Sequence, residues 1–269
     1  MCTLDAEETA ARNVLRSARQ AGFQRIQVKF PWTQVSASYL RSLGSWIRSE
    51  DLAVDALSAY VNCCQPETVL MAARAEHLRR AIDLAIDLRC GILTVWTGGY
   101  SSNLAIVDPR NHRPQAEDAV CRFISQFIPA FEEAKLSLAL ESYITLVCPD
   151  APSLRRLLNR LPVCVGAVLD PPNLTPVHRF FERDIVLQQM FQQLHGRILI
   201  AHLKDFKLNP SDDGYVLPGP LDGQMNYSLF LKQLMTLSGS IPFIAEHLSP
   251  RQFQQARSRL LAVAHSVGS

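Results

Sequence analysis

Four ionisable side chains each come directly after a short apolar stretch, a pattern typical of a metal site. They are Glu141, Asp170, His202 and Glu246. Three carboxylates brought together repel one another and raise each other's pKa, and a divalent cation removes that conflict. Three oxygen ligands and one nitrogen ligand suit Mn²⁺, Mg²⁺, Co²⁺ or Zn²⁺, with positions left for substrate oxygens. These residues therefore predict a site for one divalent metal ion.

The apolar stretches are predicted strands, and they alternate with helices along the whole chain. Strands are expected at 25–30, 52–61, 92–96, 136–141, 163–169, 198–202 and 241–246, and helices at 8–20, 36–48, 68–89, 116–134, 153–160, 185–194, 227–237 and 250–265. Such alternation implies a parallel sheet with right-handed crossovers. The sequence contains no GxGxxG, so a (β/α)₈ TIM barrel is favoured over a doubly wound dinucleotide-binding sheet. We expect one α/β barrel domain over residues 1–269.

The first strand of this barrel is doubtful. A barrel needs eight strands, and the pattern shows seven. Only Met1 to Leu4 precede the first helix, whereas an ordinary strand has about 5–6 residues. The first strand is therefore either very short or missing. If it is missing, the sheet is open between the second and eighth strands, and its edges need cover, for example from a neighbouring subunit.

Composition excludes several classes of partner. The 269 residues contain 27 Lys and Arg against 25 Asp and Glu, a formal charge of +2, which gives no electrostatic attraction for nucleic acid or an anionic membrane. No apolar run approaches the ~18 residues that a membrane helix needs. The acidic start lacks the features of a secretory signal. Seven cysteines without a CxxC indicate reduced thiols, so we expect a cytoplasmic protein.

Short segments around the four residues resemble a known family. They are Leu140-Glu141-Ser142, Leu169-Asp170-Pro171-Pro172-Asn173, Ala201-His202-Leu203-Lys204-Asp205 and Ala245-Glu246-His247, with Thr97-Gly98-Gly99-Tyr100 and Pro218-Gly219. Their order is similar to that in the sugar phosphate isomerase/epimerase group of xylose-isomerase-like TIM barrels (the AP endonuclease 2 superfamily). That group contains inosose isomerases and dehydratases, ketohexose 3-epimerases and endonuclease IV. The resemblance covers about residues 60–265 and implies that Glu141, Asp170, His202 and Glu246 bind one divalent metal.

The resemblance implies a metal-dependent isomerase or epimerase of a small keto-sugar, keto-inositol or related polyol. A metal chelated by a carbonyl and its adjacent hydroxyl acidifies the α-carbon proton by stabilising an enediolate. Glu141 and Glu246 are then expected to take and return that proton. Loss of a β-hydroxyl after the same step would make the protein a dehydratase, and a non-catalytic ligand-binding barrel is a further alternative. A nuclease is disfavoured by the near-neutral charge.

Five further residues are expected to contact substrate. Asn173 takes the place where epimerase-like members often carry His, and its amide suits a substrate hydroxyl. Lys204 holds either a substrate carboxylate or phosphate, or a loop ion pair with Asp205. Tyr100 is expected in the pocket wall, and Asn62 either binds a hydroxyl or forms a turn.

Four other side chains have more ordinary expectations. Lys29 and Lys207 are expected to be surface charges, and His247 is expected to point away from the site into packing. Trp96 suits the pocket wall and the core equally well. The resemblance also implies a small-molecule substrate and an oligomer of this chain, a homodimer or homotetramer.

Overall fold

A computed structural model gives the structure of residues 1–64, 68–209, 214–237, 239 and 241–268. Strands and helices alternate along the chain as the sequence predicts. The elements are β1 (Cys2–Thr3), α1 (Glu8–Gln20), β2 (Arg25–Lys29), α2 (Ala37–Ser49), β3 (Ala53–Asn62), α3 (Thr68–Asp87), β4 (Ile92–Trp96), η1 (Pro109–His112), α4 (Pro114–Ser125), α5 (Ile128–Ala134), β5 (Ser137–Glu141), α6 (Ala151–Leu158), β6 (Val165–Leu169), α7 (Pro171–Leu174), η2 (Val177–Glu182), α8 (Arg183–Leu194), β7 (Ile198–Leu203), β8 (Lys207–Leu208), β9 (Tyr215–Val216), α9 (Tyr227–Met235), β10 (Phe243–Ala245), η3 (Pro250–Gln252) and α10 (Phe253–Gly268).

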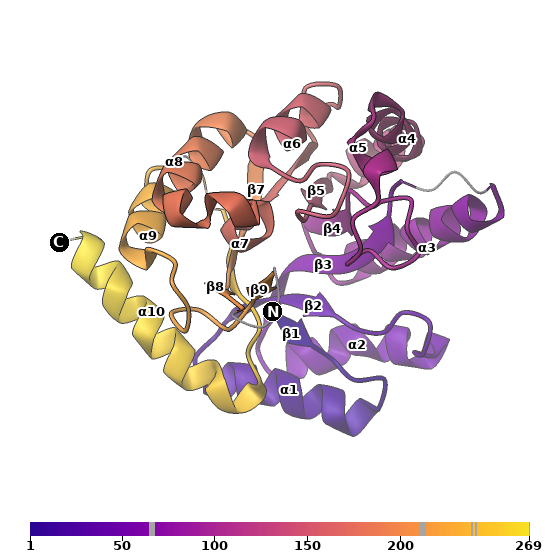
Figure 1. Ribbon diagram of the computed structural model, residues 1–269. Helices are drawn as coiled ribbons and strands as arrows, with labels where there is room; N and C mark the ends of the chain where they lie inside the picture. Colours follow the sequence, from indigo (N-terminus) through magenta and orange to yellow (C-terminus); the bar gives the residue numbers. More distant parts are fainter. Residues whose placement is uncertain (65–67, 210–213, 238, 240, 269) are drawn as a thin grey trace.

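Eight strands form one parallel sheet in the order β1-β2-β3-β4-β5-β6-β7-β10. The sheet curls around a central axis, and the long helices lie around its outside (Figure 1). This is the predicted α/β TIM-barrel-like fold. In such a fold the carboxyl ends of the strands meet at one face, where active sites form.

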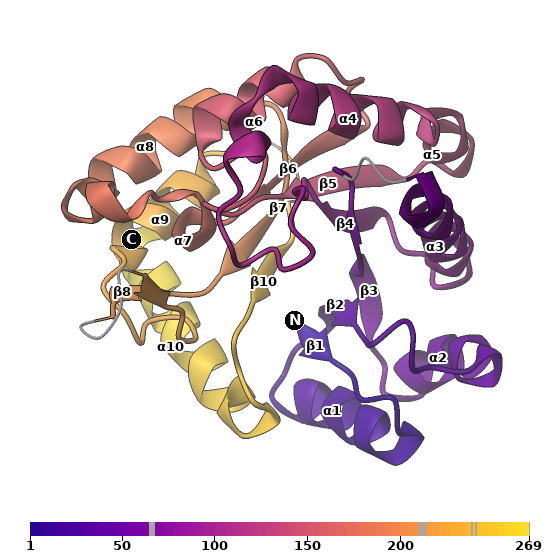
Figure 2. The ribbon, with the colours of Figure 1, turned by 45° about the vertical axis from the view of Figure 1, so that its right-hand side comes forward.

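The first strand is present and very short, so the first of the two alternatives is confirmed. Cys2 and Thr3 of β1 pair with Val28 and Lys29 of β2. Within the described ranges no ladder joins β1 to β10, so these two strands are the ends of the sheet. They nevertheless lie close together (Figure 2), and the Met1 amino nitrogen donates a hydrogen bond to the Ala245 carbonyl. The sheet is therefore a curled half-barrel whose ends meet without strand pairing.

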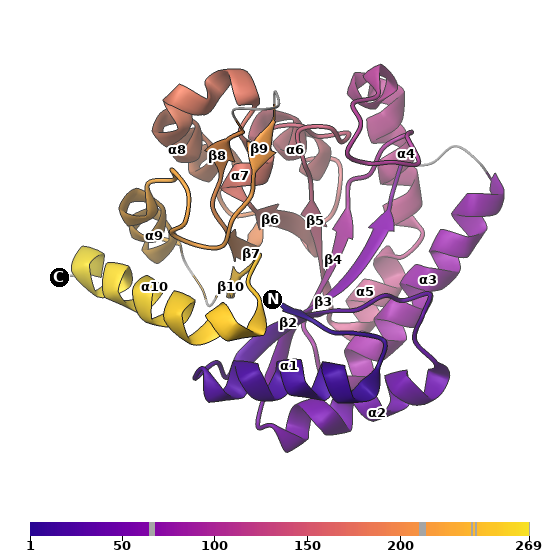
Figure 3. The same cartoon turned by 60° about the horizontal axis from the view of Figure 1, so that its bottom comes forward.

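Three local predictions were wrong. The single helix expected over 116–134 is two helices, α4 and α5, because Pro129 lies in the first turn of α5 and has no backbone N–H to continue a helix. The short helix α7 follows β6 directly, in a segment with no predicted element. The segment 207–223, for which no helix or strand is expected, contains the antiparallel pair β8 and β9, which Figure 3 shows apart from the barrel sheet.

The core has two parts. A large apolar cluster fills the space between the sheet and the surrounding helices. A small second cluster lies inside the barrel and contains one residue from each of five strands, namely Ala56, Ala139, Val168, Ile200 and Ile244. Since side chains alternate along a strand, the residue two positions beyond each of these also points inward. The inner cluster is thus the floor beneath the carboxyl-end face.

The seven cysteines are free thiols that form no disulfides. Burial raises the pKa of Cys64 and of Cys90 to about 12, so both stay protonated and unreactive at neutral pH. In the part of the chain that is described, no helix combines the length and the apolarity that crossing a membrane requires.

Candidate metal centre

The four predicted ligands come from four strands that are neighbours in the sheet. Glu141 ends β5, Asp170 follows β6, His202 lies in β7 and Glu246 follows β10. Each lies two positions beyond a residue of the inner apolar cluster, so the alternation of the strand turns it inward. The strand pattern therefore places all four side chains in one layer, directly above the apolar floor.

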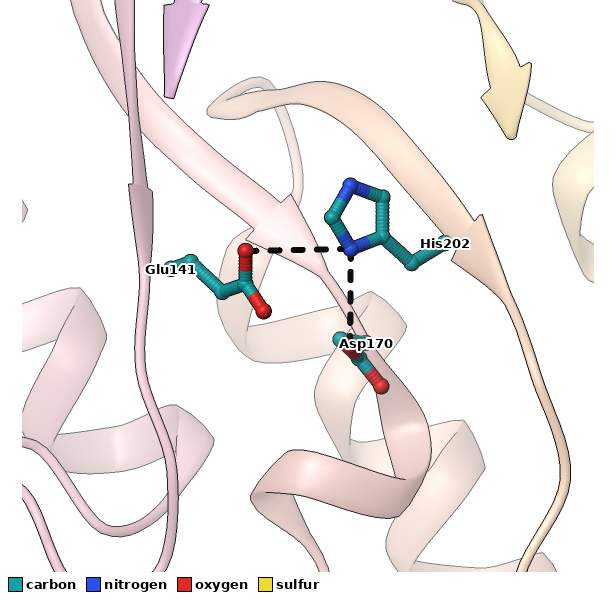
Figure 4. Close-up of side chains that lie close together, drawn as sticks. All are labelled: Glu141, Asp170 and His202. Carbon is teal, nitrogen blue, oxygen red and sulfur yellow. Dashed lines mark ion pairs between the residues drawn. The ribbon is translucent and has the colours of Figure 1, made fainter. Parts of the chain in front are cut away.

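The carboxyl groups of Glu141, Asp170 and Glu246 converge on the Nδ1 atom of His202. This atom lies 3.1 Å from Oε1 of Glu246, 3.5 Å from Oδ2 of Asp170 and 3.9 Å from Oε2 of Glu141. Figure 4 shows Glu141 and Asp170 approaching the imidazole from two sides. One ligand atom each from Glu141, Asp170 and His202 lie within 4.8 Å of one another. None of the four residues is more than 3% exposed, so three carboxyl groups share a buried site.

The oxygen and nitrogen atoms that face this centre have charged neighbours but no hydrogen bonds among the described residues. Among the described residues, Oε2 of Glu141, Nδ1 of His202 and Oε1 of Glu246 accept or donate no hydrogen bond. Oδ2 of Asp170 has none either, although the Lys204 ammonium lies 2.6 Å away as an ion pair. Buried polar atoms are nearly always paired in proteins. Two carboxylate oxygens and one imidazole nitrogen, from Glu141, Asp170 and His202, are close enough together to hold a divalent cation. Glu246 lies outside this group of three, with its Oε1 beside Nδ1 of His202.

Gln27 of β2 fixes the orientation of the imidazole, and the sequence analysis missed it. Its Nε2 donates to Oγ of Ser58 at 2.9 Å and to Oγ1 of Thr94 at 3.3 Å. Its Oε1 therefore faces Nε2 of His202 at 2.9 Å and accepts the proton there. A neutral His202 then keeps its lone pair on Nδ1, the atom that faces the carboxylates. Such outer partners are what set the tautomer of a metal-binding histidine.

Burial and the clustered charges shift the pKa values in opposite directions. Burial, with the neighbouring Glu246 and Asp170 carboxyl groups, raises the pKa of Glu141 to about 7, although His202 and Lys204 oppose the shift. Burial also opposes ionisation of Glu246, but His202 and Lys204 outweigh it and lower its pKa. For His202, burial disfavours the charged ring, yet Glu246 and Glu141 prevail and raise its pKa.

Asn173 and Lys204 hold the outer oxygens of the two glutamates. Nδ2 of Asn173 donates to Oε1 of Glu141 at 3.2 Å, and Nζ of Lys204 donates to Oε2 of Glu246 at 3.3 Å. Each glutamate thus has one oxygen aimed at the centre and one oxygen held by a neighbour. Lys204 is buried and pairs with Asp170 and Glu246, so the alternative of a solvated loop pair with Asp205 was wrong.

A cavity of about 620 Å³ opens over the centre. Its lining includes Glu141, Glu246, Asn173 and Lys204 and a largely apolar wall. Trp96 also lines it, which decides between its two expected positions. The lining residues that complete the wall are Met1, Thr3, Lys29, Tyr60, Leu104, Ala105, Tyr143, Leu146, Leu217, His247, Leu248 and Ser249.

Tyr60 is a second residue that sequence reasoning missed. Its ring packs on Trp96, with centroids 5.0 Å apart. The register of β3 against β4 shifts between Ser58 and Asn62, and Tyr60 within this bulge has φ of +48°. Burial, followed by the charges of Glu141 and Glu246, raises the pKa of Tyr60 well above its ordinary value. A bulge that re-aims a side chain beside an active site is a recurrent device, and the sequence carries no signal for it.

Two side chains expected elsewhere also line the cavity. Lys29 was predicted as a surface charge, and His247 was predicted to point away, but both face the cavity. Lys29 does so because it lies two positions beyond the inward-facing Gln27 in the same strand. Nδ1 of His247 donates to the Leu217 carbonyl at 2.7 Å. Lys207, by contrast, is exposed as predicted.

Asn62, Tyr100 and Asp205 lie outside the described lining of the cavity and have partners in the surrounding loops. Nδ2 of Asn62 donates to the Gly99 carbonyl at 2.9 Å. Tyr100 packs beneath the Arg110 guanidinium, 5.0 Å from the ring centroid. Oδ1 of Asp205 accepts hydrogen bonds from the backbone N–H groups of residues 206 and 225, at 2.8 and 2.9 Å. Contacts with substrate therefore stay predictions for these three residues.

Two glycines show how tightly these loops pack. Gly98 has φ of +83°, and a Cβ atom there would overlap Oδ1 of Asn62. A Cβ atom at Gly223 would overlap Oδ1 of Asp205. Asn62 and Asp205 therefore shape the loops that carry the rim of the site.

The fold is shared with several solved structures. A xylose isomerase-like TIM barrel protein from Mycobacterium smegmatis, in complex with magnesium, has a TM-score of 0.73 and 19% identity over 97% of this chain and 90% of its own. A D-tagatose 3-epimerase-like protein has a TM-score of 0.77 and 15% identity over 99% and 97%. The IOLI protein with a binding zinc atom has a TM-score of 0.71 and 13% identity over 98% of each chain. At these identities the likeness is one of fold.

Sequence comparison places the chain in a family. No protein of curated function matches the sequence. The family model described as xylose isomerase-like TIM barrel matches residues 15–262, nearly the whole chain. The protein therefore belongs to the xylose isomerase-like TIM barrel family.

Proposed function

We propose that this protein is a divalent-metal-dependent isomerase or epimerase of a small keto-sugar, keto-inositol or related polyol. The observation that carries the proposal is the convergence of three buried carboxylates, from Glu141, Asp170 and Glu246, on Nδ1 of His202. A divalent cation held by these residues would supply Lewis acidity, which acidifies the C–H bond beside a substrate carbonyl.

The two glutamates are suited to move the proton. Glu141 and Glu246 stand at the two ends of the arc of four strands, and both line the cavity. In the metal-free protein burial raises the pKa of Glu141 to about 7, and a bound cation would lower that pKa and favour the carboxylate form that takes a proton. Glu246 is ionised in the metal-free protein because His202 and Lys204 lower its pKa despite burial, so it is a carboxylate and the weaker base of the two. Removal by one carboxylate and return by the other inverts a carbon.

The partners of the outer oxygens have a positioning role in this scheme. Asn173 and Lys204 each hold one oxygen of a glutamate, which restricts rotation of the carboxyl group. A carboxylate fixed in this way approaches the substrate carbon in one geometry, which is how enzymes gain rate from orientation.

The first experiment is the melting temperature after chelation, with and without added Mn²⁺. A cation at about 100 times its Kd should stabilise the protein by about 2.7 kcal/mol, or roughly 5–11 °C for a chain of this size. The increase should be lost in Asp170→Ala and kept in Asp118→Ala, which alters a partly exposed carboxylate on α4. No increase with any divalent metal would overturn the metal site and the enzyme proposal with it.

The second experiment measures exchange of solvent deuterium into keto-sugars and inosose. The wild-type protein should incorporate deuterium, and Glu141→Gln should not. Both reactions begin with the same proton abstraction. A product that has lost one molecule of water relative to the substrate would identify the dehydratase alternative. Binding of a substrate in both variants, without exchange in either, would identify a non-catalytic barrel and refute the proposal.

A further inference from the structure

Lys29 occupies a position on the inward face of the barrel. It is the last residue of β2 and lies two positions beyond Gln27, which is fully buried and contacts His202. This spacing directs its side chain to the carboxyl-end face, and Lys29 is part of the cavity lining. A lysine has thus been placed in the same chamber as the two acid/base glutamates.

The charge of Lys29 has no counter-ion in the described structure. Lys204, the other lysine of the cavity, is paired with Asp170 and Glu246. For Lys29 the described residues offer no carboxylate within ion-pair distance, and its closest charge-related contact is the face of the Tyr60 ring, 4.9 Å from Nζ to the centroid. Lys29 is half-buried, and an anionic ligand in the cavity would give its ammonium a charged partner.

The Tyr60 ring lies beside this charge in the cavity wall. The ring packs between Lys29 and Trp96, and the positive φ of Tyr60 holds it there. Such a conformation costs a non-glycine residue about 1–3 kcal/mol and persists where the surroundings enforce it. The hydroxyl of the same ring donates to Sδ of Met1 at 3.9 Å, and Tyr60 and Glu141 line the same cavity. The Lys29 ammonium and the Glu141 carboxyl group therefore face one cavity, with the Tyr60 ring beside the ammonium.

We infer that the substrate carries an anionic group, a carboxylate or a phosphate, and that Lys29 binds this group and sets specificity for it. This inference rests on the proposed function, since it identifies the class of substrate for the same site. Among the described residues that line the cavity, Lys29 is the lysine without a carboxylate partner, which matches one anionic group, and the volume of about 620 Å³ admits a six-carbon chain.

Binding is tested with three six-carbon probes that differ in charge: 2-keto-D-gluconate, D-fructose 6-phosphate and neutral D-fructose. Calorimetric titration into the Mg²⁺-loaded protein should show a preference for one or both anions. Lys29→Met should weaken anion binding by about 10–100-fold, the usual effect of a charged hydrogen bond, and Lys29→Arg should restore most of it. Lys207→Met removes an exposed lysine and is the matched control. The two anionic probes distinguish a carboxylate from a phosphate.

Deuterium exchange with the same probes separates this inference from the proposed function. Anion binding that depends on Lys29, without exchange, would support the anion site and refute the isomerase. Exchange into D-fructose at least as fast as into both anions, unchanged in Lys29→Met, would support the isomerase and overturn the role of Lys29. The melting temperature of Lys29→Met is measured to test whether this variant is folded, and Lys29→Gln provides a second uncharged variant.

Discussion

Gln27 provides the sharpest test of how the metal centre is built. Replacement by Leu keeps the size of the side chain and removes the oxygen that accepts from Nε2 of His202 at 2.9 Å. Both residues are fully buried, so water does not replace the lost partner. Leaving the N–H unpaired costs about 1–3 kcal/mol, or roughly 2–12 °C in Tm. Because His202 no longer has a fixed tautomer, metal affinity should fall by about 10–100-fold.

The affinity is measured by competition with a chromophoric chelator for Zn²⁺ at constant pH, beside thermal unfolding of the metal-free protein. Gln27→Glu keeps an oxygen at the same position and should lose less affinity than Gln27→Leu. A lower Tm for Gln27→Leu with wild-type affinity for Zn²⁺ would refute the reasoning. Gln27 would then stabilise the barrel without controlling the ligand.

Three other perturbations probe the charges and the loops. The pKa of Glu141 is raised from 4.5 to about 7, so the folded protein retains a proton that the unfolded chain releases. As the pH rises from 4.5 to 7, the free energy of unfolding of the metal-free protein, measured by urea titration, should therefore fall relative to that of Glu141→Gln. The affinity for Mn²⁺ should rise over the same range. Lys204→Met leaves buried carboxylates unpaired and should cost about 3–5 kcal/mol; calorimetry should show a Tm lower by roughly 6–20 °C, regained with metal. Gly98→Ala should destabilise by about 1–3 kcal/mol in urea, whereas Gly91→Ala, with open space around it, should change little.

The ligands could be predicted because barrel strands give a simple signal. Glu141 and His202 each end a run of apolar residues, and parallel strands bring such ends to one face. The i, i+2 alternation that also directs Ile200 into the inner cluster holds without knowledge of any loop. The very short first strand was likewise one of two alternatives that the chain length before the first helix allowed.

The residues that sequence reasoning missed or misplaced follow from two physical facts. Both faces of a barrel strand are covered by other parts of the protein, so the polarity of a residue such as Gln27 or Lys29 does not indicate that its side chain points to solvent. The conformation of Tyr60 depends on a bulge between β3 and β4, which is a property of the paired strands. Similarly, Asn62 and Asp205 follow strand ends, but close contacts with Gly98 and Gly223 decide where their side chains lie.

The unpaired junction between β1 and β10 makes these two edge strands the part of the sheet that opens most easily. These strands have two and three residues, and each is held by a ladder on one side only. Amide hydrogens in such segments exchange with solvent through small openings that leave the rest of the fold intact. Glu246 follows β10 directly, so one of the four candidate ligands belongs to this edge. A cation shared with β5, β6 and β7 would fasten β10, and its amide protons would then exchange as slowly as those of the central strands.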